Sequence, residues 1–175
     1  FVIAPAMSVI PVPEGLSAER AVFAEPLSCC LNALELARLG KGDTIAIWGA
    51  GPAGTLLARA SRSMGGEPFT IEPNRRRRDI AKGSLSLGSK KFDVCIVAVG
   101  AGQAYREAIE ALNPRGRLVI FSGLQPAEDK LRVSLNKLHY YEQTIVGAYG
   151  CCFRHGVRAL HLIATGEVPV EDMIS

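Results

Sequence analysis

The stretch TIAIWGAGPAG, residues 44–54, decides the fold. The apolar run TIAIW leads directly into three glycines, and AGTLLARASRSMG then repeats apolar residues at helical spacing. This order predicts a strand, a tight turn and a helix. Gly49, Gly51 and Gly54 have the spacing G-x-G-x-x-G, in which the first glycine makes the turn, the second admits a pyrophosphate and the third lets helix and strand pack closely. The stretch therefore predicts a dinucleotide-binding unit.

The same alternation continues along the chain. EPFTIE, KFDVCIVAVG, RLVIFSG and QTIVGAYG are further strand candidates, and QAYREAIEALNPRG and RHGVRALHLIATG have helical spacing. Such alternation predicts an α/β fold, a Rossmann-type doubly wound parallel sheet with helices on both faces. Ahead of the first strand we expect a helix over residues 27–39, ended by Gly40 in the left-handed conformation.

An acidic residue and a run of arginines follow the second strand. Glu72 lies about 20 residues beyond the glycines, where a carboxylate can accept hydrogen bonds from both adenosine ribose hydroxyls. This favours NAD over NADP, because a 2′-phosphate would bring a second negative charge beside the carboxylate. The arginines at residues 75–78 could pair with that phosphate, so NADP is possible. Alternatively, one arginine stacks on the adenine while the others face water.

Composition limits the class of protein. The chain has 175 residues, 48% of them hydrophobic, which suits one globular core. Twenty basic and seventeen acidic residues give a net charge of +3, and outside residues 75–78 the basic residues are scattered, so we expect no nucleic-acid partner. The longest apolar runs are interrupted by proline or fall short of the roughly 20 residues that a membrane span needs, so we expect no membrane segment.

The cysteines and histidines suggest no metal cluster of their own. The cysteines occur as Cys29-Cys30, Cys95 and Cys151-Cys152, without C-x-x-C spacing. Reduced thiols and a cytoplasmic location are the expectation. We expect Cys151 and Cys152 to pack in the interior as small apolar groups, and the three histidines to be structural or to face solvent.

Several motifs occur together in a recognisable order: VPEGLSAERAVFAEPLSCCLNAL, GAGPAG, IEPNRRRR, CIVAVG, GRLVIFSG and TIVGAYG. The order and spacing resemble the zinc-dependent medium-chain dehydrogenases, most of all the sorbitol and threonine dehydrogenase branch. The resemblance implies that residues 1–13 are a remnant of the catalytic domain and residues 14–175 the dinucleotide-binding domain. Relatives have a further strand and helix where this chain has GSLSLGSK, so the domain is expected to be shortened near residues 83–90.

The resemblance also implies a set of site residues. Glu72 would bind the ribose, Arg77 would lie beside the adenine, and Glu25 in AEPLS would lie near the catalytic zinc, as a ligand or bound to the zinc's water. From the residues alone, the favoured interpretation of Glu25 is a helix-start acid next to a proline, and the zinc role comes only from the resemblance. The implied cofactor-binding set is Gly49, Gly51, Pro52, Ala53, Gly54, Glu72, Arg77, Val99, Gly100, Ser122, Gly123, Ala148 and Tyr149.

By this resemblance the intact enzyme is an oxidoreductase that transfers hydride between a secondary alcohol or polyol and NAD, with zinc polarising the alcohol oxygen. The family's first zinc ligands belong to an N-terminal catalytic half that this sequence does not contain. We therefore expect the chain alone to be inactive as a dehydrogenase. In such enzymes the last strand of the sheet pairs with its counterpart in a second subunit, so the resemblance implies a homodimer or homotetramer.

Three alternatives share the glycine turn. Methyltransferases that use S-adenosylmethionine also place glycines after the first strand and an acid after the second, but they lack the AEPLS lead-in. Flavin enzymes contain GAGPAG too, although there it normally opens the chain. A non-catalytic module that binds NAD would keep the same cofactor residues without the zinc chemistry.

Overall fold

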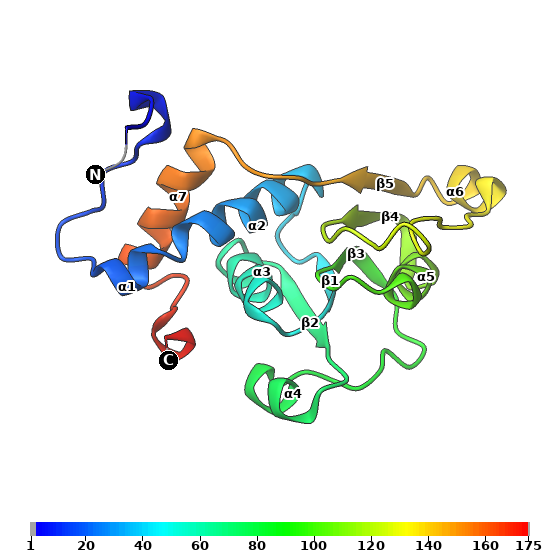
Figure 1. Ribbon diagram of the computed structural model, residues 1–175. Helices are drawn as coiled ribbons and strands as arrows, with labels where there is room; N and C mark the ends of the chain where they lie inside the picture. The colour runs from blue at the N-terminus through cyan, green and yellow to red at the C-terminus, as the bar shows by residue number, and fades with distance from the viewer. Residues whose placement is uncertain (1–2, 175) are drawn as a thin grey trace.

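The computed structural model describes residues 3–174 and has a five-stranded sheet at its centre (Figure 1). Every strand pairs parallel to its neighbours, in the order β2-β1-β3-β4-β5. The strands are β1 (Thr44–Trp48), β2 (Glu67–Ile71), β3 (Phe92–Val97), β4 (Leu112–Ile120) and β5 (Thr144–Gly147). The order reverses direction between β1 and β3, which confirms the predicted doubly wound parallel sheet.

Helices cover both faces of the sheet. The helix α3 joins β1 to β2 and α5 joins β3 to β4, which are steps in opposite directions across the sheet. Because parallel crossovers are right-handed, the two helices lie on opposite faces. The helices are α1 (Ala18–Ala21), α2 (Ala24–Leu36), α3 (Pro52–Ser63), α4 (Arg75–Ala81), α5 (Gly102–Glu110), α6 (Leu135–Tyr140) and α7 (Phe153–Ala164), with short 3₁₀ turns at Ala6–Ser8 and Glu171–Met173.

Alternate residues of β1 enter two separate apolar cores. Ile45 and Ile47 pack with residues of α2, α3 and α7, whereas Ala46 and Trp48 pack with residues of α5. Ile45, Ala46 and Ile47 are fully buried, and Trp48 is 3% exposed. A strand that is buried on both faces reads as a continuous apolar run, which is why TIAIW does not alternate. Among the described residues, no helix is both long and apolar enough to cross a bilayer.

The helix α2 differs from its predicted bounds. It begins at Ala24 and ends at Leu36, rather than spanning residues 27–39. The left-handed residue beyond it is Arg38, with φ 50°, and not Gly40. The Leu39 N–H donates to the carbonyl of Leu34, which closes the helix end before Gly40 is reached. Gly40 instead donates its N–H to the carboxylate of Asp43, in the turn that leads into β1.

The strand β4 also begins earlier than the sequence predicts. The helical spacing of the sequence predicts that residues 111–116, ALNPRG, continue a helix, but β4 starts at Leu112. Pro114 cannot continue a helix, and Arg115 lies in the left-handed region with φ 62°. The pairing with β3 shifts register between Phe92 and Val94 to accommodate this irregular start. The short helix α6 was not predicted.

Beyond β2 the sheet ends in a single bridge. Ser84 forms an isolated parallel bridge with Ile71, and the Ser84 N–H donates to the carbonyl of Thr70. A doubly wound sheet of order 3-2-1-4-5-6 carries another strand at this edge. In the described chain, residues 83–90 pass along that edge with one bridge in place of a strand.

Asp93 joins three strands at the end of the sheet opposite the glycine turn. Its Oδ2 accepts hydrogen bonds from the Thr44 N–H at 2.9 Å and hydroxyl at 2.8 Å, and its Oδ1 accepts one from the Asn113 amide at 2.9 Å. Partial burial raises the pKa of Asp93, but these hydrogen bonds and the charge of Arg117 outweigh it, so the pKa lies below its ordinary value. The ionised carboxylate therefore stabilises the fold.

Replacing Asp93 should destabilise the protein in a pH-dependent way. Asp93→Asn turns one acceptor into a donor that faces another donor, so we expect urea unfolding at pH 7 to show a loss of about 1–3 kcal/mol. Because the pKa of Asp93 is lower in the folded than in the unfolded chain, the ionised carboxylate stabilises the fold above the unfolded pKa, and this stabilisation is lost as pH falls through the folded pKa. The difference in unfolding free energy between wild type and variant should therefore narrow below about pH 4. The exposed Asp129→Asn serves as control, and equal stabilities at pH 7 would contradict this role.

Candidate cofactor site

Two glycines fix the shape of the turn between β1 and α3. Gly49 has φ 102°, and a Cβ there would lie 3.2 Å from the Ala98 carbonyl at the end of β3. A left-handed residue this close to a neighbouring backbone has to be glycine. A Cβ on Gly54 would lie 1.9 Å from the Gly49 carbonyl, so α3 packs directly onto the turn. Both glycines are therefore required by the fold itself.

Gly51 differs, because nothing in the fold requires it. Its φ of −71° suits any residue, and a Cβ there would meet no atom within 4 Å. The N–H groups of Ala53 and Gly54, at the start of the 12-residue helix α3, have no hydrogen-bond partner among residues 3–174. Open backbone next to free N–H groups at a helix N-terminus suits an anion such as a pyrophosphate. The residues present therefore fit the predicted dinucleotide.

The Glu72 carboxylate is hydrogen-bonded to the glycine turn. It follows β2, is 5% exposed, and accepts hydrogen bonds from the Ala50 N–H at 2.7 Å on Oε2 and from the Asn74 N–H at 2.9 Å on Oε1. A carboxylate has about four lone-pair positions, so about two remain for ribose hydroxyls. The structure thus brings Glu72 to the glycine turn through a contact with Ala50 that sequence reasoning missed.

The four arginines have different surroundings. Arg78 donates from Nη1 to the carbonyls of Glu72 and Pro73, both at 2.9 Å, and so holds the chain after β2. Arg75 lies 3.9 Å from Asp79 in an exposed pair. Arg77 is exposed, and its backbone N–H is capped by the side chain of Asn74. An Asn three residues before the capped N–H is a common helix start, which was the sequence signal for this role of Asn74.

The remaining predicted cofactor residues follow β3, β4 and β5. A Cβ on Gly100 would lie 3.2 Å from the Gly123 carbonyl, so the loops after β3 and β4 are in contact. Ser122 accepts a hydrogen bond from the Tyr105 hydroxyl on its carbonyl. Carboxyl ends of parallel strands share one edge of the sheet, where ligands of doubly wound folds bind. The residues that the structure brings to this edge are Val99, which is 39% exposed, Gly100, Ser122, Gly123, the buried Ala148 and the fully exposed Tyr149.

Glu25 lies at the start of α2. It is exposed and borders a cavity of ≈ 460 Å³ whose lining includes Val22, Cys151 and Cys152. Burial, together with Cys151 and Glu25, raises the pKa of Cys29 to about 11. Among the described residues, no group of three His, Cys, Asp or Glu side chains could hold a metal ion. These residues alone therefore do not fit a zinc centre, and Glu25 could supply one ligand.

Two expectations about the cysteines and histidines have different outcomes. Cys151 and Cys152 are exposed, so the prediction that they pack in the interior is wrong. The chain leaves the sheet after Ala148 and turns at Gly150, with φ 64°, before α7 begins, which leaves both thiols at the surface. His139 and His161 are exposed, in line with the expectation, whereas His155 is 4% exposed and contacts Glu35 and Cys152.

Substitutions at Gly54 and Gly51 should have different effects on stability, because only Gly54 is required by the packing of the fold. Gly54→Ala forces the Gly49 carbonyl to move and should destabilise the chain by roughly 3 kcal/mol or more. Gly51→Ala meets open space, so we expect the free energy of unfolding to change by less than about 1 kcal/mol. Urea unfolding of both variants tests this. Equal destabilisation by the two substitutions would mean that Gly51 also has a packing role.

Comparisons with known proteins agree with this architecture. The family model described as "Zinc-binding dehydrogenase" matches residues 69–165. A 2-dehydro-3-deoxy-L-galactonate 5-dehydrogenase from Pseudoalteromonas atlantica is 27% identical over 94% of this chain and 52% of its own length. The chain thus spans about half the length of this curated relative. The match favours the dehydrogenase interpretation over the methyltransferase alternative.

Solved structures share the fold. A protein described as a zinc-binding dehydrogenase from Sinorhizobium meliloti, bound to NADP, superposes with a TM-score of 0.83 at 24% identity, over 93% of this chain and 53% of its own. Acetophenone reductase from Geotrichum candidum, in complex with NAD, gives 0.80 at 21% identity, over 91% of this chain and 49% of its own. With a family model that covers more than half of its residues, this chain belongs to the zinc-binding dehydrogenase family.

Proposed function

We propose that this chain is the NAD(H)-binding part of a zinc-dependent alcohol or polyol dehydrogenase. The observation that carries the proposal is the open backbone at Gly51, with the free N–H groups of Ala53 and Gly54 beside it. The pyrophosphate would occupy this space, with Pro52 starting the helix behind it. Glu72 would accept hydrogen bonds from the adenosine ribose, and Arg77 would lie against the adenine.

The nicotinamide end would lie across the carboxyl ends of β3, β4 and β5. Val99 and Gly100 would border the cofactor's path, and Ser122, Gly123, Ala148 and Tyr149 would flank the nicotinamide and its ribose. When bound, NAD supplies the hydride acceptor, and the protein's part is to hold and orient it. Residues 14–175 would form the cofactor domain and residues 1–13 the end of a catalytic domain, which would shape the pocket for a secondary alcohol or polyol.

Zinc belongs to the proposal only for the whole protein. Glu25 would lie near the metal, as a ligand or through a bound water, and the other ligands would come from parts that this chain does not contain. The chain alone should then lack dehydrogenase activity. The β5 strand pairs within the described residues on one side, with β4, so its other edge is the proposed contact in a homodimer or homotetramer. Five free cysteines support a cytoplasmic location.

Cofactor choice is the first test of the proposal. Calorimetric titration of the chain should show NAD binding at least about tenfold more tightly than NADP, because the 2′-phosphate would face the Glu72 carboxylate. Glu72→Gln should weaken NAD binding by about 1–3 kcal/mol and reduce the preference. Gly51→Val, whose side chain fills the pyrophosphate space, should abolish binding while the fold is kept.

The other outcomes of this titration are equally informative. Tighter binding of NADP would mean that the arginines at residues 75–78 outweigh Glu72, and Arg77→Ala would then weaken NADP more than NAD. Binding of S-adenosylmethionine in place of both would contradict the dehydrogenase proposal. Because Glu72 also accepts two backbone hydrogen bonds, thermal unfolding of Glu72→Gln must accompany the titration.

NAD binding should not depend on metal. The residues proposed to hold NAD do not include Glu25, and no three-residue metal group exists among residues 3–174. We expect the same NAD affinity before and after treatment with EDTA, and with Glu25→Gln in place of the wild type. An affinity that falls on metal removal would show that zinc and cofactor sites are coupled within this chain.

A further inference from the structure

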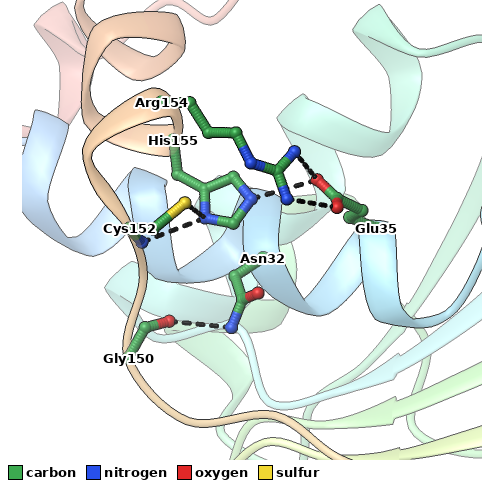
Figure 2. A network of polar contacts seen from close by, with 6 residues as sticks. All are labelled: Asn32, Glu35, Gly150, Cys152, Arg154 and His155. Atoms are coloured by element: carbon green, nitrogen blue, oxygen red, sulfur yellow. Dashed lines mark hydrogen bonds and ion pairs between the residues drawn. The ribbon is translucent and has the colours of Figure 1, made fainter.

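A buried histidine connects a thiol to a carboxylate at the start of α7 (Figure 2). His155 Nε2 lies 3.1 Å from Glu35 Oε2, and Nδ1 lies 3.4 Å from Cys152 Sγ and accepts the Cys152 N–H at 3.2 Å. With the carboxylate on the Nε2 side, the ring proton is held at Nε2. Nδ1 is then the unprotonated nitrogen, and its lone pair is shared between the backbone N–H and the thiol of Cys152.

Neighbouring groups hold this arrangement in place. Arg154 grips the Glu35 carboxylate with two hydrogen bonds, of 2.7 and 2.5 Å. Hydrogen bonds from Arg154 and His155 lower the pKa of Glu35 to about 2, so it stays ionised near neutral pH. One turn earlier on α2, Asn32 donates to the carbonyl of Gly150 at 3.0 Å. The α2 helix therefore fixes both the loop before Cys152 and the histidine behind it, as Figure 2 shows.

The two adjacent exposed thiols differ in their neighbours. Cys151 and Cys152 both line the ≈ 460 Å³ cavity beside Glu25. Cys152 has the histidine contact, whereas Cys151 lies next to Cys29, a partly buried thiol whose pKa is raised to about 11. Arg154 follows two residues later in the chain and is paired with Glu35. A base that is oriented by a carboxylate thus adjoins Cys152, an arrangement in which cysteines become nucleophilic.

We propose that Cys152 is a modification site for hydroperoxides, with His155 as its base and Glu35 as the residue that orients the base. The thiol proton passes to His155 Nδ1 as sulfur attacks one peroxide oxygen. The O–O bond breaks, and the departing hydroxide takes the proton from His155 and leaves as water. Sulfur is oxidised by two electrons to a sulfenic acid, and the peroxide is reduced. The thiol shares its cavity with Glu25, but the proposed oxidation step does not rest on the proposed cofactor function.

The test compares the two neighbouring thiols in the same chain. The 175-residue protein is treated with hydrogen peroxide and dimedone, which traps sulfenic acid, and the adduct at each cysteine is followed by fragmentation mass spectrometry. Cys152 should be labelled at least about tenfold faster than Cys151, in line with general-base assistance. Cys151→Ser should keep this rate, and Cys152→Ser should lose it. Equal labelling of the two thiols would overturn the proposal.

Two further variants separate the role of the histidine from simple exposure. His155→Gln should reduce Cys152 labelling to the rate of Cys151. Because His155 is buried and this variant could unfold, Glu35→Gln at an exposed position provides a second measurement and should slow labelling several-fold. The matched control is Glu142→Gln, which breaks another exposed ion pair, with Arg115 at 2.6 Å. If folded Glu35→Gln reacts as fast as the wild type and the control, the proposed arrangement is wrong.

Discussion

The approach of α3 to the turn after β1 is the constraint on which the cofactor edge depends. A side chain at Gly54 would come within 1.9 Å of the Gly49 carbonyl, so the helix can start here only without one. This approach directs the first N–H groups of α3 out over the end of the sheet, where they find no protein partner among the described residues. The same packing that completes the core therefore creates the proposed pyrophosphate position.

Glu72 extends this constraint to the neighbouring strand. The parallel register places Ile71 opposite Trp48, so the residue after β2 arrives beside the turn after β1. Its carboxylate then takes the Ala50 N–H, which would otherwise be buried without an acceptor in the middle of the turn. A residue assigned from sequence to ribose binding thus also supports the turn, which explains why it is buried although its proposed ligand comes from solvent.

The sequence was informative where one local pattern determines structure. Three glycines at fixed spacing, a continuous apolar strand and an acid after the next strand predicted the fold class and indicated the edge of the sheet that is proposed to bind the cofactor. Helix ends were less predictable, because Arg38 adopts the left-handed conformation that glycine usually supplies. The start of β4 depends on pairing with β3, and contacts such as that between Glu35 and His155 join residues 120 positions apart. No periodicity encodes either of them.

The two ends of the sheet differ in how their polar groups are satisfied. At the amino ends of the strands, Asp93 has its acceptors matched by donors from β1 and β4, so polar groups there are satisfied within the chain. At the carboxyl ends, the N–H groups of Ala53 and Gly54 have no acceptor among residues 3–174, and Gly51 faces open space. Unpaired donors next to a close-packed core are tolerated because water or an anion can reach them. The amino ends of the strands therefore carry a polar network that is satisfied within the chain, whereas the carboxyl ends keep backbone donors that a ligand can reach.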